Sequence, residues 1–442
     1  MTIDEYIRSN YGDNPYWFVE ECEAPYHLVR IANVRANKDY LEGQHAILGR
    51  ENTVYKGKVL ETKKTVLNYA KTILKFHADY LLGNAVDLSG DEVTVDLFNE
   101  IYKNGDYESI DFNILDRVNK FGDAYEVVYY DEGEIKSKLL DSGDCNPVHD
   151  DYGNYLALIE TWTNARSNIT YWNVHYDGYT EMYDNEGAQM NMRATVMNNG
   201  LPIHYHNVND SDYLFGQDLL KDMKPVLDCI EDTISKLGDS IYIYSLNPLM
   251  VSAGQRIENT MDADAVGYCL NLEMGSDVKM LTTEIDYNTI KLYLDNLKTF
   301  LTDTAMFPSV LANNTNVANV SEVSISLLFK LAEAMAKNNM KWLNIGFKER
   351  FKQFKKILSL VGVSNLGEVR VDYNLSTPVA SNELVGNLVA LKGAGLISTE
   401  SALEKVPYVA DVEVEKVRIN TEVPEVVEEP KTEENSDNTV NE

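Results

Sequence analysis

The sequence predicts an α+β protein built from more than one subdomain. Its 442 residues are more than a single hydrophobic core usually organises. Hydrophobic residues make up 44% of the chain and aromatic residues 10%, which is enough to build folded cores. Helical and strand-like hydrophobic patterns also occupy different stretches of the chain, so their order predicts the architecture.

The N-terminal part combines an irregular start with one strong helical pattern. Residues 1–60 show no sustained period and predict a turn-rich segment. From Glu61 the pattern becomes helical, because apolar residues recur at three- and four-residue steps from Val66 to Leu81. Gly83 follows as a typical helix stop.

After two shorter helical patterns, at 93–103 and 111–120, the texture changes to β. Short runs rich in β-branched and aromatic residues alternate with Asp/Asn/Gly turns such as 150–153 and 184–187, which favours an antiparallel meander. The segment 200–206 closes this part. The four runs are 124–130, 155–162, 168–174 and 180–183.

The middle of the chain predicts two further long helices. Residues 211–240 carry an apolar stripe from Leu219 to Leu237, and Pro225 either kinks this helix or starts its second half. Short strands and turns are expected over 241–284. A second helix runs from Ile285 and ends before Phe307 and Pro308.

A polar, Asn-rich loop at 309–320 then leads into a long helical stretch over 321–360, with Ser321 placed to cap it. Residues 363–420 predict a short strand and a small helical unit, with helices at 382–392 and 399–405. The acidic segment 421–442 is of low complexity and is expected to be disordered.

The charge balance is strongly acidic. The chain has 39 basic and 70 acidic residues, for a net charge of −31, and residues 421–442 contribute −7, which leaves −24 for residues 1–420. Proteins that grip nucleic acid normally carry a basic footprint. Any nucleic acid is therefore expected to be repelled over most of this surface and met only at a few local points.

Cysteine and histidine usage predicts neither a disulfide framework nor a metal site. The four cysteines, at 22, 145, 229 and 269, are widely spaced, which fits a reducing cytoplasm. His204 and His206 share one side of a strand but have no third ligand nearby in the sequence, so no metal and no cofactor are expected. We also expect no signal peptide and no transmembrane helix, hence a soluble protein without a membrane partner.

Five segments appear in a fixed order over roughly residues 40–360. Together they resemble the portal family of long-tailed phages that infect Gram-positive bacteria. In the first segment Leu41 replaces the second tyrosine usual in that family. The segments are Tyr40-Leu-Glu-Gly-Gln-His-Ala-Ile-Leu48, the helix 68–86 ending in Tyr-Leu-Leu-Gly-Asn-Ala-Val, Phe121-Gly-Asp-Ala-Tyr-Glu-Val-Val-Tyr129, Gly200-Leu-Pro-Ile203 with the helix 220–235, and Pro308 with the Asn-rich loop and Ser321-Glu322.

The resemblance implies a portal fold and a ring of about twelve subunits, or about thirteen in isolation. The implied parts are an α/β wing, two stem helices, a clip, a channel loop, a long wing helix, a crown and an acidic tail. Their boundaries are 1–210 for the wing, 211–240 and 285–306 for the stem helices, 241–284 for the clip, 307–320 for the loop, 321–362 for the long helix, 363–420 for the crown and 421–442 for the tail.

The function implied by the resemblance is a channel at one capsid vertex, through which double-stranded DNA is packaged and ejected without sequence specificity. The implied partners are other copies of the chain, the terminase motor, scaffolding and major capsid proteins, and a head–tail connector protein. A role in nucleating procapsid assembly is also implied. The location would be the virion, and the host cytoplasm during assembly.

Two groups of residues are candidates for contact within such a ring. The short, uncharged side chains of the loop are expected to touch DNA weakly: Asn313, Asn314, Thr315, Asn316 and Asn319. A basic cluster is expected to face DNA or the acidic surface of a neighbouring subunit: Lys341, Lys348, Arg350, Lys352, Lys355 and Lys356. The alternative for this cluster is the exposed face of a helix that packs through Phe347, Phe351 and Phe354.

Three other function classes fit less well. No Walker-type phosphate loop is present, so the chain is not expected to be the packaging motor. The 28 tyrosines and four tryptophans could serve a carbohydrate-active enzyme, but no acid/base pair of carboxylates stands out, and no enzymatic activity is expected. Another head or connector protein of a phage stays open as an alternative.

Overall fold

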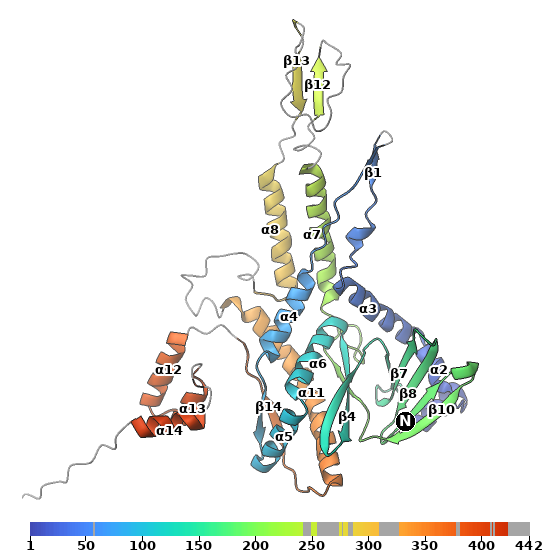
Figure 1. Cartoon of the computed structure of the whole chain (residues 1–442), viewed down its shortest axis with the longest axis vertical. Coiled ribbons are helices and arrows are strands. Elements are labelled where there is room, and N and C mark those ends of the chain that lie inside the picture. The colour runs from blue at the N-terminus through green and yellow to red at the C-terminus, as the bar shows by residue number, and fades with distance from the viewer. Residues whose placement is uncertain are drawn as a thin grey trace, which may run out of the picture. The chain divides into compact units, whose positions relative to one another are not determined.

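The protein, seen in a computed structural model, is an α+β chain that divides into two compact units (Figure 1). Unit 1 comprises Met1–Val320 with Ser326–Thr377, and unit 2 comprises Ser321–Ile325 with Pro378–Glu442. Within the described residues, no helix has the length and apolar character needed to span a membrane. The structure describes residues 1–55, 58–241, 249–253, 274–275, 277–281, 286–308, 327–376, 381–406, 409 and 412–422.

The first 41 residues are mostly helical, so the prediction of an irregular start is wrong. The helices are α1 (Ile3–Tyr11), α2 (Trp17–Cys22) and α3 (Pro25–Leu41). Local caps define them: Thr2 and Glu5 form a capping box, and Pro25 occupies the first turn of α3. A short 3-10 turn at Ala46–Gly49 and the hairpin strands β1 (Thr53–Tyr55) and β2 (Lys58–Leu60) follow.

A buried carboxylate joins these three helices. Glu21 is 1% exposed, and its carboxylate accepts hydrogen bonds from the hydroxyls of Tyr6, at 2.9 Å, and of Tyr11 and Tyr26. The Nε2 atom of His27 lies 3.1 Å from the same carboxylate. Burial alone would raise the pKa of Glu21, but these hydrogen bonds outweigh it and lower that pKa to about 2.

The predicted meander is a five-stranded antiparallel sheet of order β10-β9-β8-β7-β6. The aromatic side chains of Trp17 and Phe18 pack on it together with Ile159 and Trp172. The run 124–130, which we had expected in the meander, belongs instead to a second sheet of order β11-β4-β5. The strands are β4 (Asp123–Asp131), β5 (Glu134–Leu140), β6 (Cys145–His149), β7 (Tyr155–Asn164), β8 (Ile169–His175), β9 (Tyr179–Asp184), β10 (Asn191–Met197) and β11 (Ile203–His206), with a 3-10 turn at Glu186–Ala188.

Between these parts lie α4 (Tyr69–Leu82), α5 (Glu92–Asn104) and α6 (Tyr107–Phe121). The strong helical pattern is confirmed, although α4 begins at Tyr69 rather than near Glu61. The two shorter helices are confirmed as well. Strand β3 (Asp87–Gly90) pairs with β14 (Val369–Asp372). Strand β14 falls within the segment 363–420 expected to form the crown, and it lies in unit 1.

Helices α7 (Leu220–Ser240) and α8 (Tyr287–Thr304) lie side by side (Figure 1). Their facing stripes share one core, in which Leu227 and Ile230 of α7 pack with Leu297 and Leu301 of α8. Pro225 lies inside α7, and residues 211–219 precede the helix instead of forming its first turns. Strands β12 (Leu249–Ala253) and β13 (Asp277–Leu281) form an antiparallel pair in the segment between the two helices.

The long helical stretch is α11 (Lys330–Leu360). The structure describes the chain again from residue 327, three residues before this helix begins. Unit 2 contains α12 (Ser381–Gly393), α13 (Thr399–Glu404) and α14 (Val412–Glu422). The expected helices at 382–392 and 399–405 match the first two of these, and Ser398 caps α13 by accepting a hydrogen bond from the backbone of Ser401 at 3.0 Å.

Candidate functional site

Helix α11 packs against strands β4 and β11 of the three-stranded sheet, against β14 and against helix α4. Its apolar face carries the three phenylalanines singled out in the sequence, Phe347, Phe351 and Phe354, and all are buried. The rings of Phe351 and Phe354 pack against Phe98 of α5, tilted and edge-on respectively, with centroids 5.3 and 5.4 Å from that of Phe98. The packing interpretation of these aromatics is therefore correct, and it fixes which face of α11 is turned outward.

Arg350 is not part of an exposed basic surface, which corrects the sequence-based cluster. The side chain is 0% exposed, and its Nε donates to Glu126 of β4 at 3.0 Å. Its Nη1 donates to Asp111 of α6 and, at 3.2 Å, to the hydroxyl of Tyr102. Position 350 lies three residues after Phe347 and four before Phe354, so the helical period turns it inward with them.

The Arg350 network contains one guanidinium group and two carboxyl groups, those of Asp111 and Glu126. The hydroxyl of Tyr205 on β11 donates to Glu126 at 2.7 Å, so the network joins α11 and α6 to the neighbouring strands β4 and β11. Burial raises the pKa of Asp111 to about 6, and the opposing attraction of Arg350 does not cancel this effect. Breaking such a buried pair leaves an uncompensated charge, so the network fixes the position of α11.

The other five members of the basic cluster lie on the outer surface of α11. Lys341, Lys348, Lys352 and Lys356 are exposed and Lys355 is half-buried. Two of them are ion-paired: Nζ of Lys352 lies 3.3 Å from Glu349, and Nζ of Lys356 lies 3.7 Å from Asp177. The structure therefore reduces the candidate cluster from six cations to five.

The Asn-rich loop, with Asn313, Asn314, Thr315, Asn316 and Asn319, lies outside the described residues. The structure does describe the residues that follow α8 and those that precede α11. Both sets of residues pack against helix α4. The ring of Phe307 packs edge-on against Phe76 at 4.9 Å between centroids. Phe329 packs near Phe76 and Tyr80, at 6.2 and 5.9 Å.

These anchors, Phe76, Phe307 and Phe329, were missed from the sequence. Their only sequence signal is the aromatic character of residues that flank a polar loop. A further anchor is polar, since Nε2 of His77 lies 2.7 Å from the backbone oxygen of Ala305. Phe307 and Phe329, on either side of segment 309–326, therefore both pack on α4.

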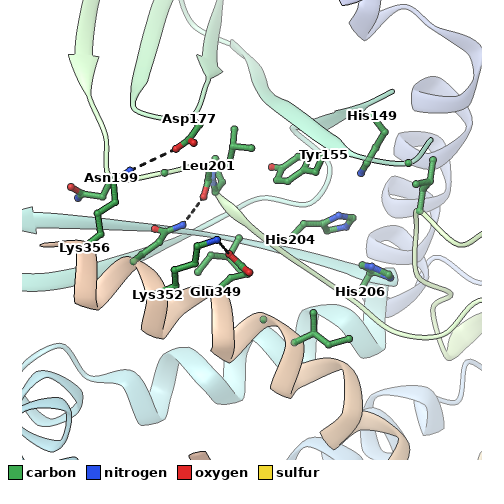
Figure 2. Close-up of a pocket in the computed structure, with 18 of the residues that line it drawn as sticks. His149, Tyr155, Asp177, Asn199, Leu201, His204, His206, Glu349, Lys352 and Lys356 are labelled. Carbon is green, nitrogen blue, oxygen red and sulfur yellow. Dashed lines mark hydrogen bonds and ion pairs between the residues drawn. The ribbon is translucent and has the colours of Figure 1, made fainter. Parts of the chain in front are cut away.

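A pocket of about 560 Å³ lies between α11 and the histidine-bearing strands (Figure 2). Figure 2 shows Glu349, Lys352 and Lys356 of α11 on one side and His149, with the β11 histidines, on the other. The Nε2 atom of His204 lies 2.8 Å from Asp123, and burial lowers the pKa of His149 to about 4.

The structure adds His149 to the pair His204 and His206. The ring centroid of His204 lies 6.2 Å from that of His149 and 5.0 Å from that of His206. Within the described residues, however, no group of three His, Cys, Asp or Glu side chains is arranged to hold a metal ion. The short contact to Asp123 and the stacking of His204 on Tyr125, at 4.7 Å, give this histidine a packing role.

Comparison with known families places the chain in a class of structural proteins of phage particles. Residues 25–439 match the family described as phage portal protein, SPP1 Gp6-like. The match spans most of the chain, and the chain belongs to this family. The DNA-channel role follows from family membership, as does a place in the virion. No curated protein sequence matches the chain significantly.

The solved structures that match the chain include three from gene transfer agent (GTA) particles. The neck of an empty GTA particle computed with C6 symmetry shows 11% identity and a TM-score of 0.46, covering 75% of this chain and 87% of that one. The virion of a native GTA particle shows 13% identity and a TM-score of 0.44, covering 75% of this chain and 86% of that one. The neck of a native GTA particle computed with C12 symmetry shows 14% identity and a TM-score of 0.44, covering 76% of this chain and 88% of that one. All TM-scores are below 0.5, so the family assignment rests on the sequence match.

Proposed function

We propose that this portal protein assembles into a closed ring of about twelve copies, with α7 and α8 at the subunit contacts around the channel. The observation that carries this proposal is the outer face of α8. Leu292 and Phe300 are 63% and 57% exposed there. They are eight residues apart, a little over two helical turns, so they leave α8 on the same side and form an apolar patch that one subunit leaves uncovered.

The parts of the subunit are assigned on this basis. Residues 1–210 form the wing, 211–240 and 285–306 the stem, 241–284 the clip, and 321–362 the long wing helix that carries the loop. Because β14 pairs with β3 in unit 1, the crown is narrowed from 363–420 to the part after Thr377. The segment 421–442 is assigned as the acidic tail, with a net charge of −7.

The loop 307–320 provides the weak DNA contact in this proposal, through the five polar residues between Asn313 and Asn319. Support comes from its two anchors, because Phe307 and Phe329 fix the ends of the segment on α4. Short uncharged donors and acceptors touch phosphate and sugar without reading sequence. A strongly cationic loop would instead hold the duplex in place through salt-sensitive attraction.

The charge of the subunit fits a channel in which DNA must slide. The net charge of −31 per copy is multiplied around a ring, so most of the wall repels phosphate. The proposed partners are those of a portal vertex: the terminase motor during packaging, scaffolding and major capsid proteins during assembly in the host cytoplasm, and a head–tail connector afterwards.

Electron microscopy and native mass spectrometry of the full chain test the ring. We expect closed rings of about twelve to thirteen copies. Replacing Leu292 and Phe300 with serine removes the uncovered apolar face, and we expect subunits or small oligomers with unchanged circular dichroism. The matched control replaces the exposed Val93 and Leu360, on α5 and α11, with serine. A stable monomer at high concentration from the parent chain contradicts the proposal.

A further inference from the structure

The lysines of α11 form a row on one side of the helix. Lys341, Lys348 and Lys355 follow one another at seven-residue intervals. Seven residues are close to two helical turns, so the three side chains leave the helix in nearly the same direction. At ~1.5 Å per residue, the row spans about 21 Å.

The row stands out because its cations are not neutralised. Within the described residues, no ion pair involves Lys341, Lys348 or Lys355, and Lys341 contacts only the side-chain oxygen of Asn338, at 3.5 Å. Other lysines of the same helix are paired, including Lys330 and Lys337, both with Glu333 at 2.6 Å. In a chain with 70 acidic residues, these three unpaired cations give one side of α11 a row of uncompensated positive charge.

A fourth cation lies across a shallow groove from the row. Arg370 of β14 lines this opening of about 480 Å³ together with Lys348, Lys352 and Lys355. The carboxylate of Glu368 lines the same opening, and Asp372 lines its extension. Asp91 is also within electrostatic range of Lys355, though hydrogen bonds from Thr94 contribute most to the lowering of its pKa. Cations remain in the majority along the groove rim.

We propose that this row, Lys341, Lys348 and Lys355 with Arg370, is a sequence-independent contact for the phosphate backbone of double-stranded DNA. The inference rests on the proposed function, which brings DNA to the protein. Each strand of duplex DNA carries one charge per ~3.4 Å of its axis, so a row of about 21 Å spans about six phosphates of one strand. Long, flexible lysines without a fixed acceptor suit contacts that hold the backbone and read no base.

The other anionic partner at hand is a second copy of this chain. Lysine is depleted in the cores of protein–protein interfaces, where aromatic residues and arginine are enriched. The row contains three lysines, and the nearby phenylalanines are buried inside the subunit rather than offered to a partner. DNA is therefore the partner that the row fits better, and contact with a neighbouring copy is the outcome that the experiment must separate from it.

The test uses the assembled ring of the full chain and a fluorescent linear duplex, with binding measured between about 50 and 200 mM salt. The test variant replaces Lys341, Lys348 and Lys355 with glutamine. The control variant replaces Lys38, Lys120 and Lys136, which lie on other elements and are ion-paired with Asp141, Asp116 and Asp131. Each variant loses three positive charges, so the net charge changes equally in both.

We expect the row variant to bind the duplex at least about tenfold more weakly near 0.1 M salt, with a shallower dependence of log K on log salt. The control variant should stay within about twofold of the parent, and both should form rings. Equal losses in the two variants, or an unchanged row variant, would overturn the DNA contact while leaving the portal function in place. Loss of rings in the row variant alone would reassign the row to a subunit contact. Absence of rings in the parent would instead count against the proposed function.

Discussion

Arg350 shows how a single residue can be placed wrongly by composition and correctly by periodicity. It stands among five lysines in the sequence, yet the structure buries it between Glu126 and Asp111. The phenylalanines at 347, 351 and 354 predicted the buried face of the helix, and position 350 belongs to that face. The two carboxylates that accept its hydrogen bonds lie more than 200 residues away in sequence, so no local sequence pattern predicts these interactions.

Replacing Arg350 with methionine should lower the free energy of unfolding by about 3–5 kcal/mol, because Glu126 is then left buried without its cation. Lys352→Met, two positions away on the exposed face, should change it by less than about 0.5 kcal/mol. Urea unfolding followed by circular dichroism measures both. Equal effects of the two substitutions would show that the network does not carry stability.

The pH dependence of stability gives a second test of the same network. The pKa of Asp111 is raised from its ordinary value of 3.8 to about 6 in the fold, mainly by burial. A raised pKa in the folded state means that the stabilising proton is fully bound below about pH 4 and is lost as the pH rises through 6. Asp111→Asn should therefore become more stable relative to the parent as the pH rises from about 4 to about 7, by up to about 3 kcal/mol. A constant difference between the two proteins across that range would contradict the assignment.

At the scale of elements, what the sequence could predict depended on the length of the regular pattern. Helices α4, α7, α8 and α11 and the strands β7, β8 and β9 have sustained periods and were expected from the sequence. Helix α8 and the strands lie close to their expected bounds, whereas α4 and α7 begin about eight to nine residues later than expected. The short helices α1 and α2 depend on a capping box and on the tyrosines around Glu21, which have no period to detect. The pairing of β3 with β14 joins segments about 280 residues apart, so only the folded chain reveals it.

The candidate sites follow the same rule. The outward lysines of α11 could be predicted because the phenylalanine stripe defines the opposite face. The anchors on α4 could not, because the contacts of Phe76 with Phe307 and Phe329 connect residues brought together only by the packing of α4 with the ends of α8 and α11. His149 likewise joins His204 only through the meeting of two different sheets.

At the scale of the whole molecule, the acidic balance and the local cations belong to one argument. A ring of subunits with a charge of −31 each repels DNA over most of its wall, so the places that do contact the duplex decide how firmly it is held. In our proposal the lysine row offers a few salt-sensitive contacts, and the polar loop offers uncharged ones. The balance between repulsion and these contacts sets how easily DNA moves in either direction.

Substitutions in the Asn-rich loop test this balance directly. Replacing Asn314 and Asn316 with lysine adds two positive charges per subunit, repeated around the ring, and each new phosphate contact steepens the salt dependence of binding. Packaging should slow while rings assemble normally. Replacement of the same residues with aspartate should act oppositely and loosen the hold on packaged DNA. Packaged DNA per head is the measurement, with assembled rings counted in parallel. If both variants fill and retain DNA like the parent, the loop does not face the duplex, and the lysine row is then left as the proposed contact.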